Sequence, residues 1–341
     1  MKKYNVLVIF FFIQFNIASD ILSINTSGQF WSTGYHNSHI MDNPYNMELG
    51  YIPKISSFHM MGDNSMIDFE YAQYIFKNHN NYDDNKVISN KYRSWIRFSN
   101  DNLDLRIGLQ KITFGTASFL RPLAWFDSLD FKFTTGQTDG VESLRLIFSP
   151  SNSLAIWLWS IDDNASNNSY GARVELSNTI GDWGFTYYQD SGDSFLFSEN
   201  NRLGIDYRYD GNFGFWIEGC YFDFTNIDDS IFLTLGFDYT LPISNGLLIS
   251  AETMFSEIDL LNVIEKQTYT VLHLSLPIDH INHLTFFSLR DWKDRDPMSR
   301  VDNSNNIRWS TTYDSFNIDY MFTLNPGRFN DIFQIMFIYN H

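Results

Sequence analysis

Seven arginines occur in short segments in which polar and apolar residues alternate: Arg93, Arg97, Arg106, Arg145, Arg173, Arg202 and Arg208. Acidic residues, Asp104, Glu175 and Glu218 among them, occupy the same alternate positions. Side chains two apart on an extended chain point to one side, so these charges share a face opposite a face of Leu, Ile and Phe. So many charges in a dry interior would be costly, and they therefore indicate either water or dense ion pairing. In an aqueous space they could orient polar solutes.

Bond-breaking chemistry has weaker support. Catalysis needs a nucleophile, a base and an orienting group together. His273, His280 and His283 lie near Ser275, but no nucleophile motif surrounds them. We therefore predict that the chain is not an enzyme and needs no cofactor. We also predict no metal site, because the oxygen ligands around Asp83 have no defined spacing.

The elements that must position the charged residues are predicted β-strands. Leu103–Gln110 alternates cleanly after the turn Asn100–Asn102, and Tyr92–Phe98 precedes it with Tyr92, Ile96 and Phe98 on the apolar side. Another tight turn, Asp210–Asn212, joins two further alternating segments. About eighteen segments follow the first twenty residues, or sixteen if the first pair is excluded, and Pro53 weakens the second of them. A tilted strand needs roughly 9–11 residues to cross a bilayer, which these segments approach.

The connections between the segments alternate in length. The short ones are Asn100–Asn102, Pro150–Asn152, Asn178–Asp182, Asp210–Asn212, Pro242–Asn245 and Asp314–Ser315. The long ones are Asn78–Asn90, Phe114–Asp139, Asp162–Tyr170, Asp190–Asn201, Asp223–Ser230 and Asp291–Asn306. This alternation predicts an all-β fold, a transmembrane antiparallel β-barrel with short periplasmic turns and long extracellular loops. We expect Trp31, Trp157, Trp159, Trp183 and Trp309 at the membrane interfaces, and the alternative for each is an ordinary core aromatic residue.

The first residues predict export. Lys2 and Lys3 precede an apolar run from Val6 to Phe15, and Ala18 and Ser19 follow it, as in a secretory signal peptide. We therefore expect residues 1–19 to be a signal peptide and residues 20–341 to be the barrel. The formal net charge of -17 argues against a nucleic-acid partner.

Phe114–Asp139 is the longest interruption in the alternating pattern, and it is rich in aromatic residues. A long loop in a compact fold is usually functional or disordered, and this one is too aromatic to be disordered. We expect residues 114–139 to fold inward as a constriction loop, with Arg121, Trp125, Asp127 and Asp130 facing the wall arginines. The alternative is a loop that caps the barrel from outside.

The chain resembles bacterial outer-membrane porin-like β-barrels in its signal peptide, its alternating segments and its final Phe333, Ile335, Phe337 and Tyr339. It is also similar to an uncharacterised porin-like family that shares a Gln-Lys-Ile-x-Phe-Gly strand end and a Leu-Arg-Pro/Ser-Leu-x-Trp-Phe-Asp loop. The matching residues are Gln110–Gly115 and Leu120–Asp127. The resemblance implies insertion by the barrel-assembly machinery, but it brings no substrate.

The sequence thus predicts a bacterial outer-membrane porin-like channel for passive diffusion of small polar or charged solutes. Its expected partners are outer-membrane lipid, those solutes and the assembly machinery. A homo-oligomer is possible. The alternative is a non-conducting barrel with a structural or surface-adhesion role. Net acidity favours cations in the pore whereas the arginines favour anions, so the ion preference stays open as well.

Overall fold

The computed structural model describes residues 23–37, 45–79, 87–127, 137–162, 168–192, 199–225, 229–260, 263–292, 303–324 and 331–341. The predicted signal peptide lies outside these ranges. Within them, no helix is long and apolar enough to cross a membrane.

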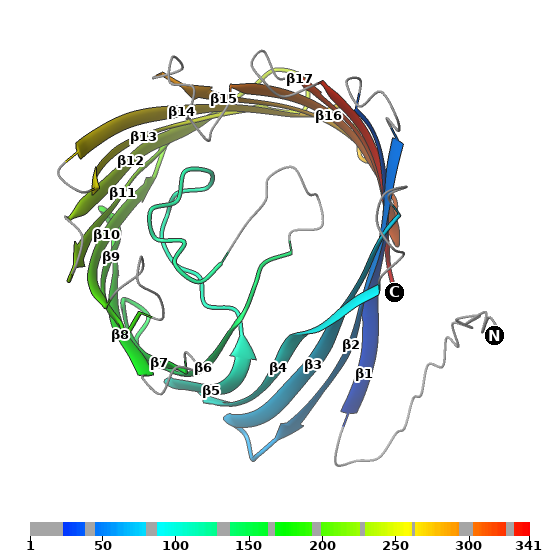
Figure 1. Ribbon diagram of the computed structural model, residues 1–341. Coiled ribbons are helices and arrows are strands. Elements are labelled where there is room, and N and C mark those ends of the chain that lie inside the picture. Colours follow the sequence, from blue (N-terminus) through cyan, green and yellow to red (C-terminus); the bar gives the residue numbers. More distant parts are fainter. Residues whose placement is uncertain are drawn as a thin grey trace, which may run out of the picture.

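Eighteen strands form one antiparallel sheet (Figure 1). They are β1 (Ser23–Asn37), β2 (Tyr45–Met60), β3 (Ser65–His79), β4 (Val87–Asn100), β5 (Leu103–Gln110), β6 (Val141–Ser151), β7 (Leu154–Asp162), β8 (Asn168–Asn178), β9 (Gly181–Asp190), β10 (Asn200–Asp210), β11 (Gly214–Phe224), β12 (Ser230–Leu241), β13 (Leu247–Leu260), β14 (Val263–Pro277), β15 (Asn282–Asp291), β16 (Ser304–Thr312), β17 (Phe316–Leu324) and β18 (Ile332–Asn340). Each pairs with its neighbours in sequence, and β1 also pairs with β18. The sheet is therefore a closed barrel, as predicted, and both strands of the first pair belong to it.

Proline in the second strand is accommodated by a gap in pairing. Pro53 lies opposite Gly28 of β1, while the ladder between β2 and β3 stops at Tyr51 and resumes at Lys54. Because proline has no N–H to donate, it belongs where a ladder is interrupted. The weak strand signal at this point reflects the interruption and not the end of a strand.

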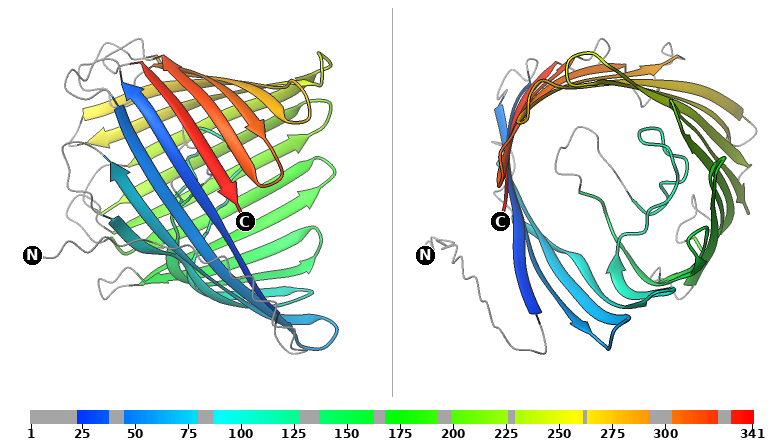
Figure 2. Two further views of the ribbon diagram at one scale, coloured as in Figure 1. Left: turned by 90° about the vertical axis from the view of Figure 1, so that its right-hand side faces the viewer. Right: turned by 180° about the vertical axis from the view of Figure 1, so that it is seen from behind.

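The two rims of the barrel differ as the sequence predicted. At the short-turn rim, β4 and β5 are joined by residues 101–102 and β8 and β9 by residues 179–180. At the long-loop rim, β5 and β6 are separated by residues 111–140, the longest of all the connections. The connection between β13 and β14, residues 261–262, is the exception on that rim. Figure 2 shows the tilt of the strands between the rims.

One short turn shows how side chains replace missing backbone partners at the rim. In the turn between β14 and β15, Asp279 accepts hydrogen bonds from the backbone N–H groups of Ile281 and Asn282 and from the Asn282 side chain. The side-chain amide of Asn282, followed by these backbone groups, holds the pKa of Asp279 below its usual range.

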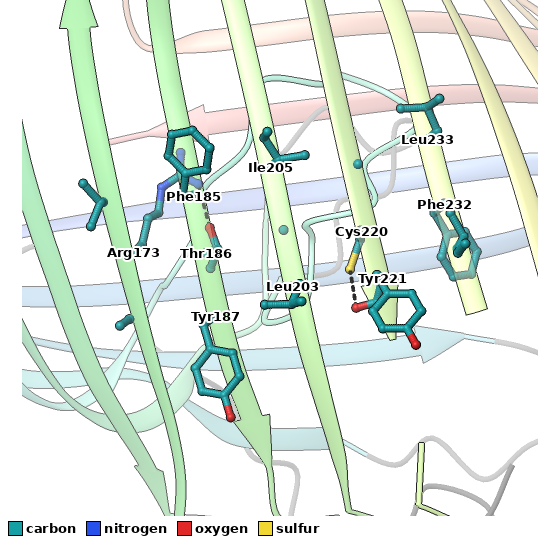
Figure 3. Close-up of a pocket in the computed structure, with 15 residues that line it drawn as sticks. Arg173, Phe185, Thr186, Tyr187, Leu203, Ile205, Cys220, Tyr221, Phe232 and Leu233 are labelled. Carbon is teal, nitrogen blue, oxygen red and sulfur yellow. Dashed lines mark hydrogen bonds between the residues drawn. The ribbon is translucent and has the colours of Figure 1, made fainter. Parts of the chain in front are cut away.

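The outward-facing positions are apolar and exposed, and the inward-facing positions are mostly polar. In β10, Leu203 and Ile205 face out with 53% and 45% of their surface exposed, whereas Asp206 is buried inside. A hollow of about 650 Å³ lies on the outer face of β8–β12 around Gly219, lined by such side chains as Phe185, Leu203 and Ile205 (Figure 3). This inverted polarity is that of a barrel surrounded by lipid.

Two apolar clusters lie inside the barrel and correct part of the sequence analysis. Trp31 packs with Ile52, Ala72, Met336 and Ile338, and Trp159 packs on the loop between β5 and β6. Trp157 alternates with the exposed Leu158 and also faces inward, beneath Arg145. The assignment of Trp31, Trp157 and Trp159 to membrane interfaces was therefore wrong. Alternation separates two faces but does not say which face meets lipid when both carry aromatic rings.

The inward position of Tyr92 is a second correction. A register shift between β3 and β4 pairs Ala72 with Arg93 and Gln73 with Lys91, so Tyr92 lies unpaired between them. An extra residue in one strand changes the side to which its neighbours point. Tyr92 and Arg93 consequently both face the lumen, where the Arg93 guanidinium lies 4.1 Å from the centre of the Tyr92 ring.

The outward assignment predicts the effect of a charge at Ile205. Replacing Ile205 with Lys should lower the free energy of unfolding in lipid vesicles by about 2–4 kcal/mol, the cost of a charge at mid-bilayer. The matched variant Ile205→Leu should cost less than about 1.5 kcal/mol. If guanidinium unfolding showed equal losses of the free energy of unfolding for the two variants, Ile205 would face water instead of lipid.

Candidate functional site

Residues 111–127, the first described part of the connection between β5 and β6, turn into the barrel and pack against its inner wall (Figures 1 and 2). Ile112, Phe114, Leu123 and Phe126 of this loop form one buried cluster with wall residues of β7, β9 and β11, namely Trp159, Ile161, Tyr188 and Cys220. The ring centres of Phe114 and Trp159 are 5.6 Å apart, and those of Phe126 and Tyr188 are 5.0 Å apart. The aromatic side chains that distinguish the loop in the sequence thus dock it on the lumen side of the wall.

A glycine in the wall admits the loop at its closest point. Leu123 is almost fully buried, and a Cβ at Gly204 of β10 would lie 2.5 Å from its Cδ2 atom. Any larger residue at position 204 would therefore displace Leu123.

Glu218 of β11 holds the first turn of the loop. One carboxylate oxygen, Oε2, accepts the backbone N–H groups of Thr116 and Ala117, both at 2.8 Å, and Oε1 accepts that of Leu123 at 2.7 Å. Gly115 precedes this turn with a φ of +94°, and a Cβ there would lie 2.5 Å from Glu218 Oε2. Glycine is therefore required at position 115 both for its backbone conformation and for space.

Glu252 of β13 holds the next residues of the loop. It accepts the backbone N–H groups of Ser118, Phe119 and Leu120 at 2.6, 2.9 and 2.6 Å. The indole N–H of Trp216 donates to the same carboxylate at 3.1 Å. On β12, the hydroxyl of Thr234 donates to the carbonyl of Leu120 at 2.7 Å. Beyond these contacts, the Phe119 ring lies 5.1 Å from that of His273 and 5.5 Å from that of Phe287.

The returning end of the loop contacts a different part of the wall. The Arg93 guanidinium donates to the carbonyl of Thr138 at 2.8 Å, and the N–H of Thr138 donates to the Tyr92 hydroxyl at 3.3 Å. The Gln137 amide donates to Gln29 of β1 at 3.5 Å. The described ends of the loop are therefore fixed to β11–β13 on one side and to β1 and β4 on the other.

Two of the four predicted constriction residues, Arg121 and Asp127, contact each other. The Arg121 guanidinium lies 3.1 Å from the buried Asp127 carboxylate, and both bond to the Thr113 hydroxyl. Trp125 donates its indole N–H to the carbonyl of Pro122 and stacks on Tyr188. Asp130 lies outside the described residues. Among the described wall arginines, Arg202 lies close to these loop residues: its guanidinium is 5.7 Å from the centre of the Trp125 ring.

Three of the predicted arginines form a row across β4, β5 and β6. Arg97, Arg106 and Arg145 are register neighbours. Asp104 reaches all three, at 3.3, 3.9 and 3.5 Å, and Asp68 makes two hydrogen bonds with Arg97 at 2.8 and 2.9 Å. The guanidinium groups of Arg106 and Arg145 also lie over Trp95 and Trp157, at 4.3 and 5.4 Å. This row contains more basic than acidic side chains.

The other arginines on the wall are paired individually. Arg173 bonds Asp206 at 2.6 Å and Glu175 at 2.7 Å, and only 4% of its side chain is exposed. Arg202 pairs with Asp190. Arg208 pairs with Asp210 at 2.9 Å and with Asp238 at 3.3 Å. The seven arginines thus lie along β4–β10, where they bond to neighbouring strands or to the loop.

The histidine group shows one close contact. The Ser275 hydroxyl lies 2.6 Å from Nε2 of His283, on β14 and β15. Among the described residues no carboxylate bonds His283, so this pair lacks the orienting group that a hydrolytic triad requires. Within the same residues, no group of three metal-binding side chains occurs either.

Comparison with solved structures identifies the architecture. OpdK, an outer-membrane protein of Pseudomonas aeruginosa, superimposes with a TM-score of 0.64 at 8% identity, covering 94% of this chain and 99% of its own. OccK5 (OpdH) from the same organism gives 0.62 at 10% identity, covering 93% and 97%. Salmonella typhi OmpF, in complex with daunomycin, gives 0.55 at 8% identity, covering 94% and 98%. This chain has the porin fold.

The porin fold is all that these similarities show, because the identities are low. No protein-family profile matches the sequence. No curated protein matches it. A fold does not establish a function, so the role and the solute have to be argued from this chain's own residues.

Sequence reasoning placed Glu218 on the inner face but missed Glu252, Trp216 and Gln29. Glu252 alternates with Ser250 and Ser256 in β13, so the same period-2 rule could have found it. Its partners could not be found this way, since they are backbone N–H groups more than 130 residues away.

The contact at Gly204 predicts that a larger residue there loosens the loop. Gly204→Leu should displace Leu123 and expose Cys220, the chain's single cysteine, which is buried in the same cluster. We expect maleimide to label Cys220 several-fold faster in this variant. Gly219→Leu on β11 is the matched control, because a Cβ there meets nothing closer than 3.6 Å. Equal labelling in the two variants would show that the loop does not depend on this contact.

Proposed function

We propose that this protein is an outer-membrane channel through which small polar or charged solutes diffuse passively. The observation that carries the proposal is the polar interior of an eighteen-stranded barrel, crossed by a loop whose described ends are fixed to the wall. Barrels of this size enclose more space than side chains can fill, which favours a water-filled lumen.

Two cavities beside the returning end of the loop support an aqueous path. One, of about 410 Å³, is lined by residues of β1–β4 and by Asn340. It includes the ion pair of Lys54 and Glu70, whose nitrogen and oxygen are 3.9 Å apart and whose side chains are 42% and 22% exposed. The second, of about 450 Å³, lies between Tyr74, Lys91 and Gln137–Gly140. Both are lined by polar and ionisable groups, which suits passage of hydrated solutes.

The charges on the wall are unevenly distributed, which supports a channel that orients its solutes. The seven arginines of β4–β10 lie on one part of the wall, whereas the acidic residues Glu48 and Asp319 lie on β2 and β17, where the charge of Asp319 interacts with that of Arg308 on β16. A solute between such surfaces would align its dipole with the field. The dense pairing of the arginines favours the second candidate, a non-conducting structural or adhesion barrel, because paired charges also brace a wall.

Conductance of the refolded protein in a planar bilayer, under a salt gradient, separates the two candidates. A channel gives stable conductance steps, and the sign of the reversal potential shows which charges dominate. Deleting residues 119–130 should then enlarge the steps, because the described part of this segment, residues 119–127, packs on the inner wall of the barrel. A correctly folded barrel that never conducts would establish the structural role.

Removing the carboxylate shared by three arginines should change selectivity. Asp104→Asn leaves Arg97, Arg106 and Arg145 with less compensating charge, so the reversal potential should shift toward anion preference. Asp210→Asn is the matched control, since that side chain is 62% exposed at the short-turn rim. An unchanged reversal potential in Asp104→Asn would remove the arginine row from the conduction path.

A further inference from the structure

The loop is held by two carboxylates that accept hydrogen bonds from its backbone. Glu218 receives three backbone N–H groups of the loop, and Glu252 receives three more together with the Trp216 indole. The five consecutive amides of residues 116–120 are all used in this way. Successive N–H groups that converge on an anion form a known type of anion-binding concavity, and here the anion belongs to the protein itself.

Neither glutamate makes an ion pair with any residue that the structure describes. The register neighbours of Glu218 are Asp206, which is bound to Arg173, and Thr234. Glu252 faces Gly236 and Val271. The other titratable groups nearby are Cys220, on the strand of Glu218, and His273, which contacts Phe119. The negative charges are therefore stabilised chiefly by the amides of the loop.

We propose that Glu218 and Glu252 form an acid-releasable latch that fixes the loop across the lumen. This inference rests on the proposed channel function. Only the ionised carboxylates fit the contacts, because both oxygens of each group accept hydrogen bonds and an added O–H would meet an N–H donor. The stabilisation is present while the carboxylates are ionised and is lost as the pH falls and they protonate.

The other attachment of the loop does not titrate in the same way. Arg93 holds the carbonyl of Thr138, and a guanidinium stays charged throughout the relevant range. Acid therefore releases the part of the loop near residues 116–123 while the end near Thr138 stays attached. If the loop narrows the channel, conductance rises in acid.

Amide hydrogen exchange of the peptide covering residues 111–127 tests the latch directly, whether or not the protein conducts. In Glu218→Gln or Glu252→Gln the side-chain NH₂ opposes N–H donors, so protection of residues 116–120 should fall by about tenfold or more, since hydrogen bonds to charged groups are the strong ones. The matched control is Glu257→Gln, which removes the same charge from β13 at an exposed pair with Lys266. It should leave this protection unchanged.

The wild-type protein supplies the pH arm of the experiment. Acidification to about pH 3, below the ordinary pKa of a glutamate, should lower the protection of residues 116–120, after correction for intrinsic exchange rates, and should enlarge the conductance steps. Where a glutamine variant does not fold, Gly115→Ala breaks the latch from the loop side through its contact with Glu218 Oε2. Protection that survives acid and the Gly115→Ala change would overturn the latch. Lost protection in a barrel that never conducts would instead retain the latch and refute the channel.

Discussion

A strand in lipid must find partners for all its backbone N–H and C=O groups within the protein, because the hydrocarbon offers none. The pairing of β1 with β18 meets this demand by closing the sheet. The polarity of the molecule follows from that closure. Side chains such as Ile205 turn outward, while charged groups such as Asp206 turn into the enclosed space. Even Pro53 obeys the constraint, since it falls at a gap in the ladder between β2 and β3.

The loop between β5 and β6 must also find partners for its backbone groups, although no neighbouring strand is available to pair with it. Its five consecutive amides have no strand to pair with, and Glu218 and Glu252 take the place of strand carbonyls. The aromatic side chains of the loop then cover the wall cluster around Trp159 and Tyr188. Backbone satisfaction and apolar burial are therefore achieved within one segment, residues 112–126, which explains how an irregular segment can hold one shape inside a barrel.

The alternating strands could be predicted from the sequence, whereas the register shift, the inward-facing tryptophans and the contacts of the loop could not. Alternation located the strands and placed the seven arginines on the inner face, because a side-chain period of two is local. It failed at Tyr92, where a register shift reverses the alternation, and at Trp31, Trp157 and Trp159, which pack inside. The site itself depends on contacts between distant segments. Nothing near Glu252 in the sequence indicates that Ser118 will donate to it.

The distance along the chain between the loop and its anchors has a consequence for assembly. Residues 118–120 precede Glu252 by 132–134 positions, and the seven strands β6–β12 lie between the loop and β13 in the sequence. Contacts this far apart in sequence form late, because the chain between them has to be ordered first. The loop therefore docks after β11 and β13 have formed, and the pairing of β1 with β18, which joins residues up to 311 positions apart, comes later still.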